Sequence, residues 1–285
     1  MTDFSALAGG IVRLAERARA LHDRMLVVKL GGSAMEEPAA TRGTLEAVAA
    51  LRSLGVKLIL VHGGGKPIDR AMEAAGLTPV KIAGRRTTDD ATMGIVERVL
   101  TEINAGLVAQ LRALGTDAVP LLDALGGERL MLPGVDLAPI DLGRVGKITA
   151  VREVELEDLA DHGTVPVIPS MARDTDGGRL NVNADTVAAA IAGAVEAEAC
   201  VFLTDTPGVL RNVADASSRI AKLTRAECDA LIDDGTIAGG MLPKVEACFE
   251  ALDAGAGMAI ILDGRRPHAL LAWFLGEPSG TTIVS

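Results

Sequence analysis

Two glycine clusters, each placed directly after an apolar run, hold the first residues of this sequence that could do chemistry. The chain reads VVKLGG at 27–32 and ILVHGGGK at 59–66. Glycines let backbone N–H groups approach an anion, and a helix start adds a favourable dipole. A lysine inside an apolar run, such as Lys29, is costly to bury unless it meets an anion. Both clusters therefore predict an anion site, although a tight turn, or a lysine that reaches solvent, would explain either cluster taken alone.

The second cluster is not the Walker phosphate-binding loop. That motif requires glycine at the position of Leu60 and Ser or Thr at the position of Pro67. Lys66 is therefore not interpreted as a P-loop lysine. The residues that follow, PIDRAMEAAG, begin a helix, so the glycines lie between the end of a strand and the start of a helix, where open α/β folds bind ligands.

Paired arginines and a group of amide and carboxylate side chains occur farther along the chain. GRRTTDD contains Arg85 and Arg86 just before an expected helix that Thr88 would cap. An arginine can grip a carboxylate through two parallel hydrogen bonds, which suits a small acidic substrate, but loop arginines are usually solvated. Asn183 and Asp185 precede an alanine-rich helix, where capping is the alternative to a role in a site.

Charged residues also stand at two later strand or helix ends. Asp205 follows Thr204 at the end of an apolar run, and Lys244 follows two glycines at the start of a helix. Two lysines, Lys29 and Lys244, and an aspartate at such ends form a constellation that can neutralise phosphate charge.

The elements that must position these residues alternate between strand and helix. Continuous apolar runs predict strands that are buried on both faces of a parallel sheet. They lie at 25–30, 57–62, 117–122, 164–169, 200–205 and 258–263. Helical patterns lie between them, and several end on glycine. The alternation predicts an α/β fold, a three-layer αβα sandwich with a mainly parallel open sheet.

Residues 123–153 interrupt this alternation with scattered Gly and Pro, and we interpret them as hairpins at the edge of the sheet. Residues 171–181 are interpreted as a turn-rich loop. The predicted organisation is an N-terminal amphipathic helix at 1–24, an N-terminal lobe at 25–175 and a C-terminal lobe at 176–285.

Composition excludes several classes of partner. The 285 residues carry a formal net charge of -10, which argues against nucleic acid or an anionic membrane. No apolar run approaches the roughly 18 residues that span a bilayer. The three cysteines show no pairing pattern, which favours a reducing compartment. We therefore expect a cytoplasmic protein.

Taken in order, seven segments resemble the amino acid kinase superfamily and, within it, the N-acetylglutamate kinases. They are VVKLGGSAM, VHGGGKPID, GRRTTDD, LNVNAD, LTDTPGVL, GGMLPKV and ILDGRRPHALL. The resemblance covers nearly the whole chain from about residue 25. It implies that ATP phosphorylates the γ-carboxylate of N-acetyl-L-glutamate, the second step of arginine biosynthesis. It also implies that the N-terminal lobe binds the acid and dimerises, that the C-terminal lobe binds ATP and Mg²⁺, and that the chain forms a homodimer or homohexamer.

The resemblance implies roles for individual residues. Lys29 and Lys244 would stabilise the transferring phosphoryl group, and Asp185 would orient these two lysines. Because the accepting γ-carboxylate, with a reference pKa of about 4.3, is already ionised at neutral pH, the reaction needs no general base. His62 is therefore interpreted as a structural residue that is hydrogen-bonded near its turn.

Binding roles follow in the same way. The resemblance assigns the acid substrate to Gly64, Gly65, Arg86 and Asn181. It assigns the nucleotide to Gly31, Gly32, Thr204, Asp205 and Gly208. No residue is assigned as a metal ligand, although Mg²⁺ is expected with ATP.

Two segments depart from the family pattern near the expected acyl side of the substrate. VLTEINAGLV is one residue shorter than the usual VLxGxxN, and LLDALGGERL differs from the common glycine-rich hairpin. The N-terminal helix and EPSGT resemble the parts with which arginine-inhibited members form hexamers and bind their effector, so feedback by L-arginine is a hypothesis. The alternatives are a same-fold kinase for carrier-linked aminoadipate, glutamate, aspartate or UMP, and a catalytically silent member.

Overall fold

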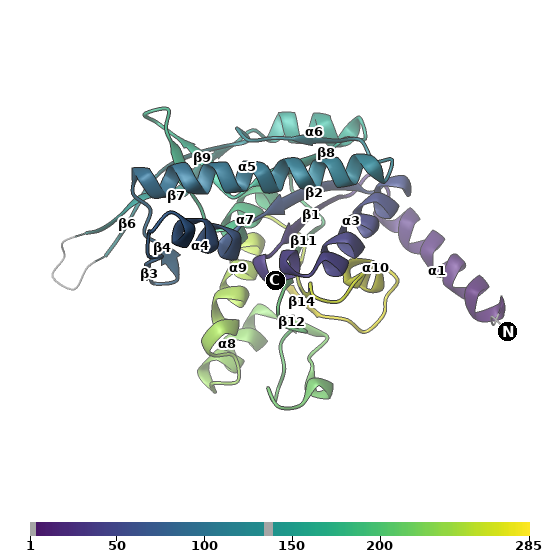
Figure 1. Cartoon of the computed structure of the whole chain (residues 1–285). Helices are drawn as coiled ribbons and strands as arrows, with labels where there is room; N and C mark the ends of the chain where they lie inside the picture. Colours follow the sequence, from purple (N-terminus) through teal and green to yellow (C-terminus); the bar gives the residue numbers. More distant parts are fainter. Residues whose placement is uncertain (1–3, 134–138) are drawn as a thin grey trace.

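An eight-stranded, mostly parallel sheet with helices on both faces forms the centre of the molecule (Figure 1). The computed structural model describes residues 4–133 and 139–285. The strand order is β12-β14-β13-β11-β1-β2-β8-β5, and only the β13–β14 pair is antiparallel. The strands are β1 (Met25–Leu30), β2 (Lys57–His62), β5 (Ala118–Pro120), β8 (Val165–Pro169), β11 (Ala199–Thr204), β12 (Lys222–Thr224), β13 (Ala259–Asp263) and β14 (Thr281–Val284).

The helices divide between the two faces because successive strand residues point to opposite sides. On β1, Val28 packs in a core shared with α3 (Pro38–Ser53), α5 (Asp90–Ala113) and α10 (Ala269–Phe274). Val27 packs in the core of the opposite face, which is covered by four other helices. These are α6 (Glu153–Asp161), α7 (Ala184–Ala194), α8 (Arg225–Asp233) and α9 (Leu242–Ala254). The predicted three-layer αβα sandwich is confirmed.

A second, smaller sheet corrects two predictions. Its strands are β6 (Leu125–Leu132), β7 (Ile140–Val151), β9 (Met171–Asp174) and β10 (Arg179–Asn181). They pair in the closed order β10-β7-β6-β9, separate from the main sheet. The hairpin prediction for 123–153 is correct, but its placement at the edge of the main sheet is wrong. The prediction of a loop at 171–181 is also wrong, because these residues form the hairpin of β9 and β10. The two strands pair with β6 and β7 and close the small sheet, which leaves few unpaired backbone groups at its edges.

Three further helices and one short hairpin belong to the part of the chain that the structure describes. They are α1 (Phe4–Leu21), α2 (Gly32–Glu36), α4 (Gly65–Ala74) and the short hairpin of β3 (Lys81–Ile82) and β4 (Arg85–Arg86). Two 3₁₀ turns, Ala216–Ser218 and Gly239–Met241, precede β12 and α9. Figure 1 shows α1 extending from the body of the molecule. None of the described helices has both the length and the apolar character needed to cross a membrane.

The start of α5 differs from the predicted cap. Asp89, not Thr88, is the N-cap, and its carboxylate accepts the Thr92 N–H at 2.7 Å. Thr88 is fully buried and donates its hydroxyl to the Arg86 carbonyl at 2.9 Å. The Thr88 hydroxyl is engaged by the Asn181 amide and the Arg86 carbonyl, so it does not cap the helix. The Asp89 carboxylate also gains from the helix dipole.

His62 ties the end of β2 to the rest of the fold. Its side chain is fully buried, with Nδ1 lying 3.0 Å from the Gly63 carbonyl and Nε2 lying 3.1 Å from the Asn104 amide nitrogen. The same Asn104 amide donates to the Val167 carbonyl of β8 at 2.8 Å. This arrangement suits a neutral imidazole that donates through Nδ1 and accepts through Nε2, and burial lowers the pKa of His62 to about 4.

The buried imidazole predicts a loss of stability in mild acid. The folded-state pKa lies below the ordinary value of about 6.5, so the unfolded chain takes up the proton first as the pH falls. The contribution of His62 is complete above about pH 6.5 and is lost between there and about pH 4. The loss in the free energy of unfolding amounts to about 2 kcal/mol at pH 5. Urea unfolding at pH 7.5 and pH 5 measures it.

His62→Gln serves as the control, because glutamine cannot titrate while the carboxylates remain unchanged. The free energy of unfolding should fall by about 2 kcal/mol more in the unchanged protein than in this variant. Equal losses in both proteins would show that His62 does not carry the effect, and an imidazole NMR titration of the unchanged protein gives the same information if the variant does not fold.

Candidate functional site

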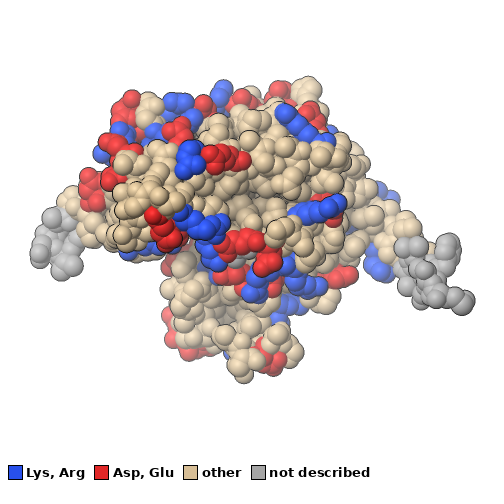
Figure 2. Space-filling view, viewed as in Figure 1, with Lys and Arg blue, Asp and Glu red and all other residues tan. Residues whose placement is uncertain are grey.

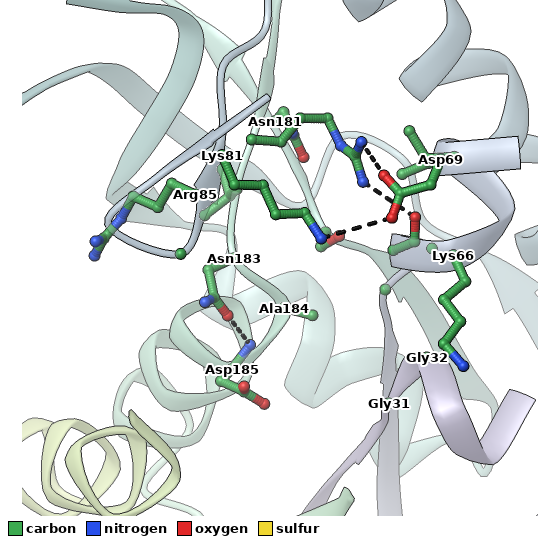
Figure 3. Close-up of a pocket in the computed structure, with 18 of the residues that line it drawn as sticks. Gly31, Gly32, Lys66, Asp69, Lys81, Arg85, Asn181, Asn183, Ala184 and Asp185 are labelled. Carbon is green, nitrogen blue, oxygen red and sulfur yellow. Dashed lines mark hydrogen bonds and ion pairs between the residues drawn. The ribbon is translucent and has the colours of Figure 1, made fainter. Parts of the chain in front are cut away.

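A cavity of about 290 Å³ opens where β1 and β2 end, between the two glycine turns (Figure 3). Figure 2 shows Lys and Arg gathered, with Asp and Glu between them, across the middle of this face. Five cationic side chains and two carboxylates line the cavity: Lys29, Lys66, Lys81, Arg85 and Arg86, with Asp69 and Asp185. Three positive charges are therefore in excess in a chain whose formal net charge is -10. This local excess suits a ligand with several negative charges.

Lys29 and Asp185 form the ion pair at the base of the cavity. Lys29 Nζ lies 2.7 Å from Asp185 Oδ1, and Lys29 is only 8% exposed. Asn183 caps α7 by accepting the Asp185 N–H at 2.7 Å, so the cap fixes the helical turn that carries the carboxylate. The sequence left a cap or a site role open for these two residues, and the structure gives Asn183 the cap and Asp185 the ion pair. Burying a lone ammonium at this depth would be costly, so the carboxylate stabilises it.

The glycines of the two turns fall into two kinds. A Cβ at Gly31 would lie 2.7 Å from the Leu203 carbonyl and 3.0 Å from Lys29 Nζ, and a Cβ at Gly64 would lie 2.8 Å from the Leu100 side chain. Gly31 requires glycine because a backbone carbonyl lies in the way, whereas Gly64 is crowded by the ends of apolar side chains. By contrast, Gly32 and Gly65 leave open space above the backbone, and a Cβ at Gly32 would have the Gly65 nitrogen, 4.0 Å away, as its nearest neighbour. The two turns thus face each other across a gap in which an anion could contact backbone N–H groups.

Arg86 stands on the opposite wall and is only 7% exposed. Its guanidinium forms an ion pair with Asp69 and donates to the Gly65 carbonyl at 3.1 Å. Asp69 also lies 3.6 Å from Lys81 Nζ, so one carboxylate serves two cations of the β3–β4 hairpin. The buried guanidinium is held in place for a ligand by groups that belong to the protein.

Asn181 lies next to this wall. Its side-chain amide donates to the Thr88 hydroxyl at 3.1 Å, and that hydroxyl donates to the Arg86 carbonyl. Asn181 enters the cavity from β10, so the β9–β10 segment that the sequence analysis interpreted as a loop supplies part of the site.

Four predicted site residues lie outside the lining of this cavity: Lys244, predicted as catalytic, and Thr204, Asp205 and Gly208, predicted to bind the nucleotide. Lys244 Nζ lies 2.8 Å from Asp205 Oδ1, and this contact holds the pKa of Asp205 below its usual range. The structure therefore pairs Asp185 with Lys29 and pairs Lys244 with Asp205. The buried Thr204 hydroxyl lies 3.0 Å from the Thr206 hydroxyl within the same turn. Gly208 has a φ of 117°, and a Cβ there would lie 2.5 Å from Thr281 Oγ1.

Several residues of the site had no predicted role. Asp69 pairs with both Lys81 and Arg86, and Glu36 at the end of α2 contacts Lys66 and Arg70. Asp69 lies four residues after Gly65, so the glycine cluster could have pointed to it. Glu36 and Lys66 are thirty residues apart, and no local pattern connects them. Within residues 4–133 and 139–285, no group of three or more His, Cys, Asp or Glu could hold a metal ion.

A second cavity, of about 580 Å³, lies between α1 and the C-terminal segment. Charged residues of both signs line it: Arg17, Arg219, Glu198 and Glu277. Trp273 and Met258 supply apolar surface. Arg219 Nη2 donates to the Pro278 carbonyl at 2.7 Å and so shapes the loop after α10. The lining suits a small zwitterion with an extended side chain.

Comparison with known sequences gives one consistent result. The amino acid kinase family matches residues 24–263. The chain is 42% identical over 250 residues to the acetylglutamate kinase of Prochlorococcus marinus (strain NATL1A). The aligned residues cover 87% of this chain and 81% of that protein. It is 38% identical over 282 residues to the acetylglutamate kinase of Methanocella arvoryzae (strain DSM 22066 / NBRC 105507 / MRE50), which covers 94% of each.

Solved structures share the fold. The N-acetylglutamate synthase of Neisseria gonorrhoeae, complexed with coenzyme A and N-acetyl-glutamate, has a TM-score of 0.85 at 23% identity over 98% of this chain. This chain spans only 63% of that protein. The carbamate kinase of Giardia has a TM-score of 0.66 at 16% identity, over 92% of this chain and 98% of that one. At such identities the likeness concerns the fold alone.

The base of the cavity predicts strong coupling between its two charges. Lys29→Met leaves Asp185 without its partner, and Asp185→Asn leaves Lys29 without its counter-charge. Because each single change leaves a partly buried charge unpaired, the double variant should be about 2 kcal/mol more stable than the sum of the single effects predicts. Urea unfolding of the four proteins measures this coupling, and effects that simply add within about 0.5 kcal/mol would contradict the pairing.

Proposed function

Because the chain belongs to the amino acid kinase family, it is a phosphotransferase, and we propose that it transfers the terminal phosphoryl group of ATP to the γ-carboxylate of N-acetyl-L-glutamate. This reaction forms N-acetyl-L-glutamyl 5-phosphate in arginine biosynthesis. The relatives that match most of the chain at about 40% identity carry this activity in their names, so the resemblance predicted from the seven motifs is confirmed. The observation that carries the proposal is the cavity with excess positive charge between two glycine turns.

The chemistry matches what these residues can supply. The γ-carboxylate is ionised at neutral pH, so the barrier lies in bringing two anions together in line and in stabilising charge on the phosphoryl oxygens. Lys29 lies at the base of the cavity and is proposed to contact those oxygens, with Asp185 fixing its position. The open backbone at Gly32 and Gly65 is proposed to offer N–H groups to the phosphate.

The acid and the nucleotide are proposed to enter from opposite sides. Arg86 and Asn181, with Gly64 and Gly65, are proposed to hold the acid on the side of the N-terminal lobe (25–175). Gly31 and Gly32 are proposed to contact the phosphates. The proposed C-terminal lobe (176–285) would hold the rest of the nucleotide with Thr204, Asp205 and Gly208.

Lys244 is proposed to change partner during the reaction. Its ammonium is paired with Asp205, outside the lining of the cavity. To stabilise the same phosphoryl group as Lys29, it must leave that carboxylate when ATP binds. A half-buried pair of this kind is exchangeable, because the phosphate offers more negative charge than one carboxylate.

Mg²⁺ is proposed to arrive with the nucleotide. The carboxylates near the cavity are committed to lysines and arginines, which suits an ion that is held mainly by phosphate oxygens and water. When bound, Mg²⁺ would neutralise phosphate charge.

L-arginine is proposed as a feedback inhibitor that binds the second cavity. Glu198 and Glu277 could accept a guanidinium, while Arg17 and Arg219 could accept a carboxylate. The synthase of Neisseria gonorrhoeae, which shares the fold, was also solved with coenzyme A and L-arginine. The chain is further proposed to form a homodimer or homohexamer, since Ile11 and Val12 of α1 are 58% and 57% exposed. The cytoplasmic location stays a prediction.

Kinetics of three variants test the proposed catalytic roles. Lys29→Ala and Lys244→Ala should each lower kcat by about 10²-fold or more, because each removes a charge that stabilises the transition state. Arg86→Ala should mainly raise the KM for N-acetylglutamate. ADP release is measured with N-acetylglutamate, glutamate, aspartate, aminoadipate and UMP in turn. Activity on another acid, or near-normal turnover of Lys244→Ala, would contradict these roles.

Inhibition by arginine is tested at the second cavity. Glu277→Gln should raise the half-inhibitory concentration of L-arginine by about tenfold, because it removes a carboxylate that could pair with the guanidinium. Glu16→Gln, on α1 but outside the cavity lining, should leave that concentration unchanged. The hypothesis fails if the unchanged enzyme is indifferent to arginine while sedimentation shows only dimers.

A further inference from the structure

Lys66 is a cation of the main cavity to which neither the fold nor the proposed reaction has yet given a role. It lines the cavity beside Gly65 and Gly32 and stands in the first turn of α4. A positive charge in the first turn of a helix lies at the unfavourable end of the helix dipole. Four other cationic side chains line the same cavity. The position therefore favours an anion near Lys66.

The counter-charge of Lys66 is supplied by one exposed contact. Glu36, the last residue of α2, forms an ion pair with Lys66 through Oε2 and with Arg70 through Oε1, the latter at 2.8 Å. The Lys66 and Arg70 side chains are each 62% exposed. One carboxylate thus serves two solvated cations, an arrangement that holds neither of them strongly and that a phosphate can displace.

The nucleotide phosphates are proposed to lie within reach of the same side chain. Figure 3 shows Lys66 extending from α4 toward the segment that begins at Gly32. A Cβ at Gly32 would lie 4.0 Å from the Gly65 nitrogen, so the two turns meet directly before Lys66. The five residues of α2 span only about 7 Å. Rotation of the lysine side chain can therefore move its ammonium from Glu36 toward Gly32.

We propose that Lys66 is a further phosphate-binding residue. When the nucleotide binds, the Lys66 ammonium separates from Glu36 and contacts the terminal phosphates. The inference rests on the proposed function, because it requires ATP at the Gly31–Gly32 turn. Glu36 is then the counter-ion of Lys66 in the free protein and competes with the nucleotide for it. The alternative is a purely structural role, in which Glu36 connects α2 to α4 and its ion pairs with Lys66 and Arg70 are equivalent.

The two roles predict opposite signs for one pair of variants. The dissociation constant of the non-hydrolysable ATP analogue AMP-PNP is measured by calorimetry in the absence of acid substrate. Lys66→Met should weaken binding about fivefold to tenfold, because it removes a cation from the phosphates. Glu36→Gln should strengthen binding about threefold, because it removes the competing carboxylate.

Arg70→Met is the matched control. It breaks the other half of the same Glu36 contact, from a side chain of equal exposure that does not line the cavity. Its effect on AMP-PNP binding should stay below about twofold. AMP, which lacks the terminal phosphates, should bind Lys66→Met and the unchanged protein equally. N-acetylglutamate binding should also be the same for both.

Four results would overturn the inference. If Lys66→Met, Glu36→Gln and Arg70→Met all weaken AMP-PNP binding to the same degree, the residues only tie two helices together. If Lys66→Met weakens AMP as much as AMP-PNP, the lysine does not contact the terminal phosphates. If the unchanged protein binds no nucleotide, the proposed function fails and this inference fails with it. If the unchanged protein and Lys66→Met bind AMP-PNP equally well, the inference alone is rejected.

Discussion

Excess positive charge at one end of the sheet is the constraint on which the rest of the structure depends. A cavity that attracts two anions must hold several cations, partly shielded from water, without destabilising the protein before any ligand binds. The structure meets this requirement by giving nearly every cation a carboxylate. The pairs are Lys29 with Asp185, Lys81 and Arg86 with Asp69, Lys66 with Glu36, and Lys244 with Asp205. The buried pairs hold fixed positions, and the exposed pairs can exchange partners.

The fold creates this constraint and also resolves it. Parallel strands bring their carboxyl ends to one edge, so the turns after β1 and β2 meet although about thirty residues separate them. A Cβ at Gly31 would meet the Leu203 carbonyl of β11, and a Cβ at Gly64 would meet side chains of α4 and α5. The cap at Asn183 and the buried His62 then hold the neighbouring elements in register. Charge, backbone geometry and packing therefore belong to one arrangement.

Sequence reasoning succeeded where a signal was local and strong. Long apolar runs placed β1 and β2, and ordered motifs identified the family. It failed where elements were short or contacts distant: β9 and β10 have four and three residues around a turn, too few to show a period. The choice of Asp89 over Thr88 as cap depended on a tertiary contact of Thr88. Glu36 could not have been joined to Lys66, because only the meeting of two turns brings them together.

This cavity is proposed to transfer the terminal phosphoryl group of ATP to a carboxylate, and identifying the product tests this most directly. An acyl phosphate reacts with hydroxylamine to give a hydroxamate, whereas a phosphate ester does not. Incubating the protein with Mg-ATP, N-acetyl-L-glutamate and hydroxylamine should yield a hydroxamate in equal amount to the ADP that is released. ADP without hydroxamate, or hydroxamate formed equally well without N-acetylglutamate, would contradict the account.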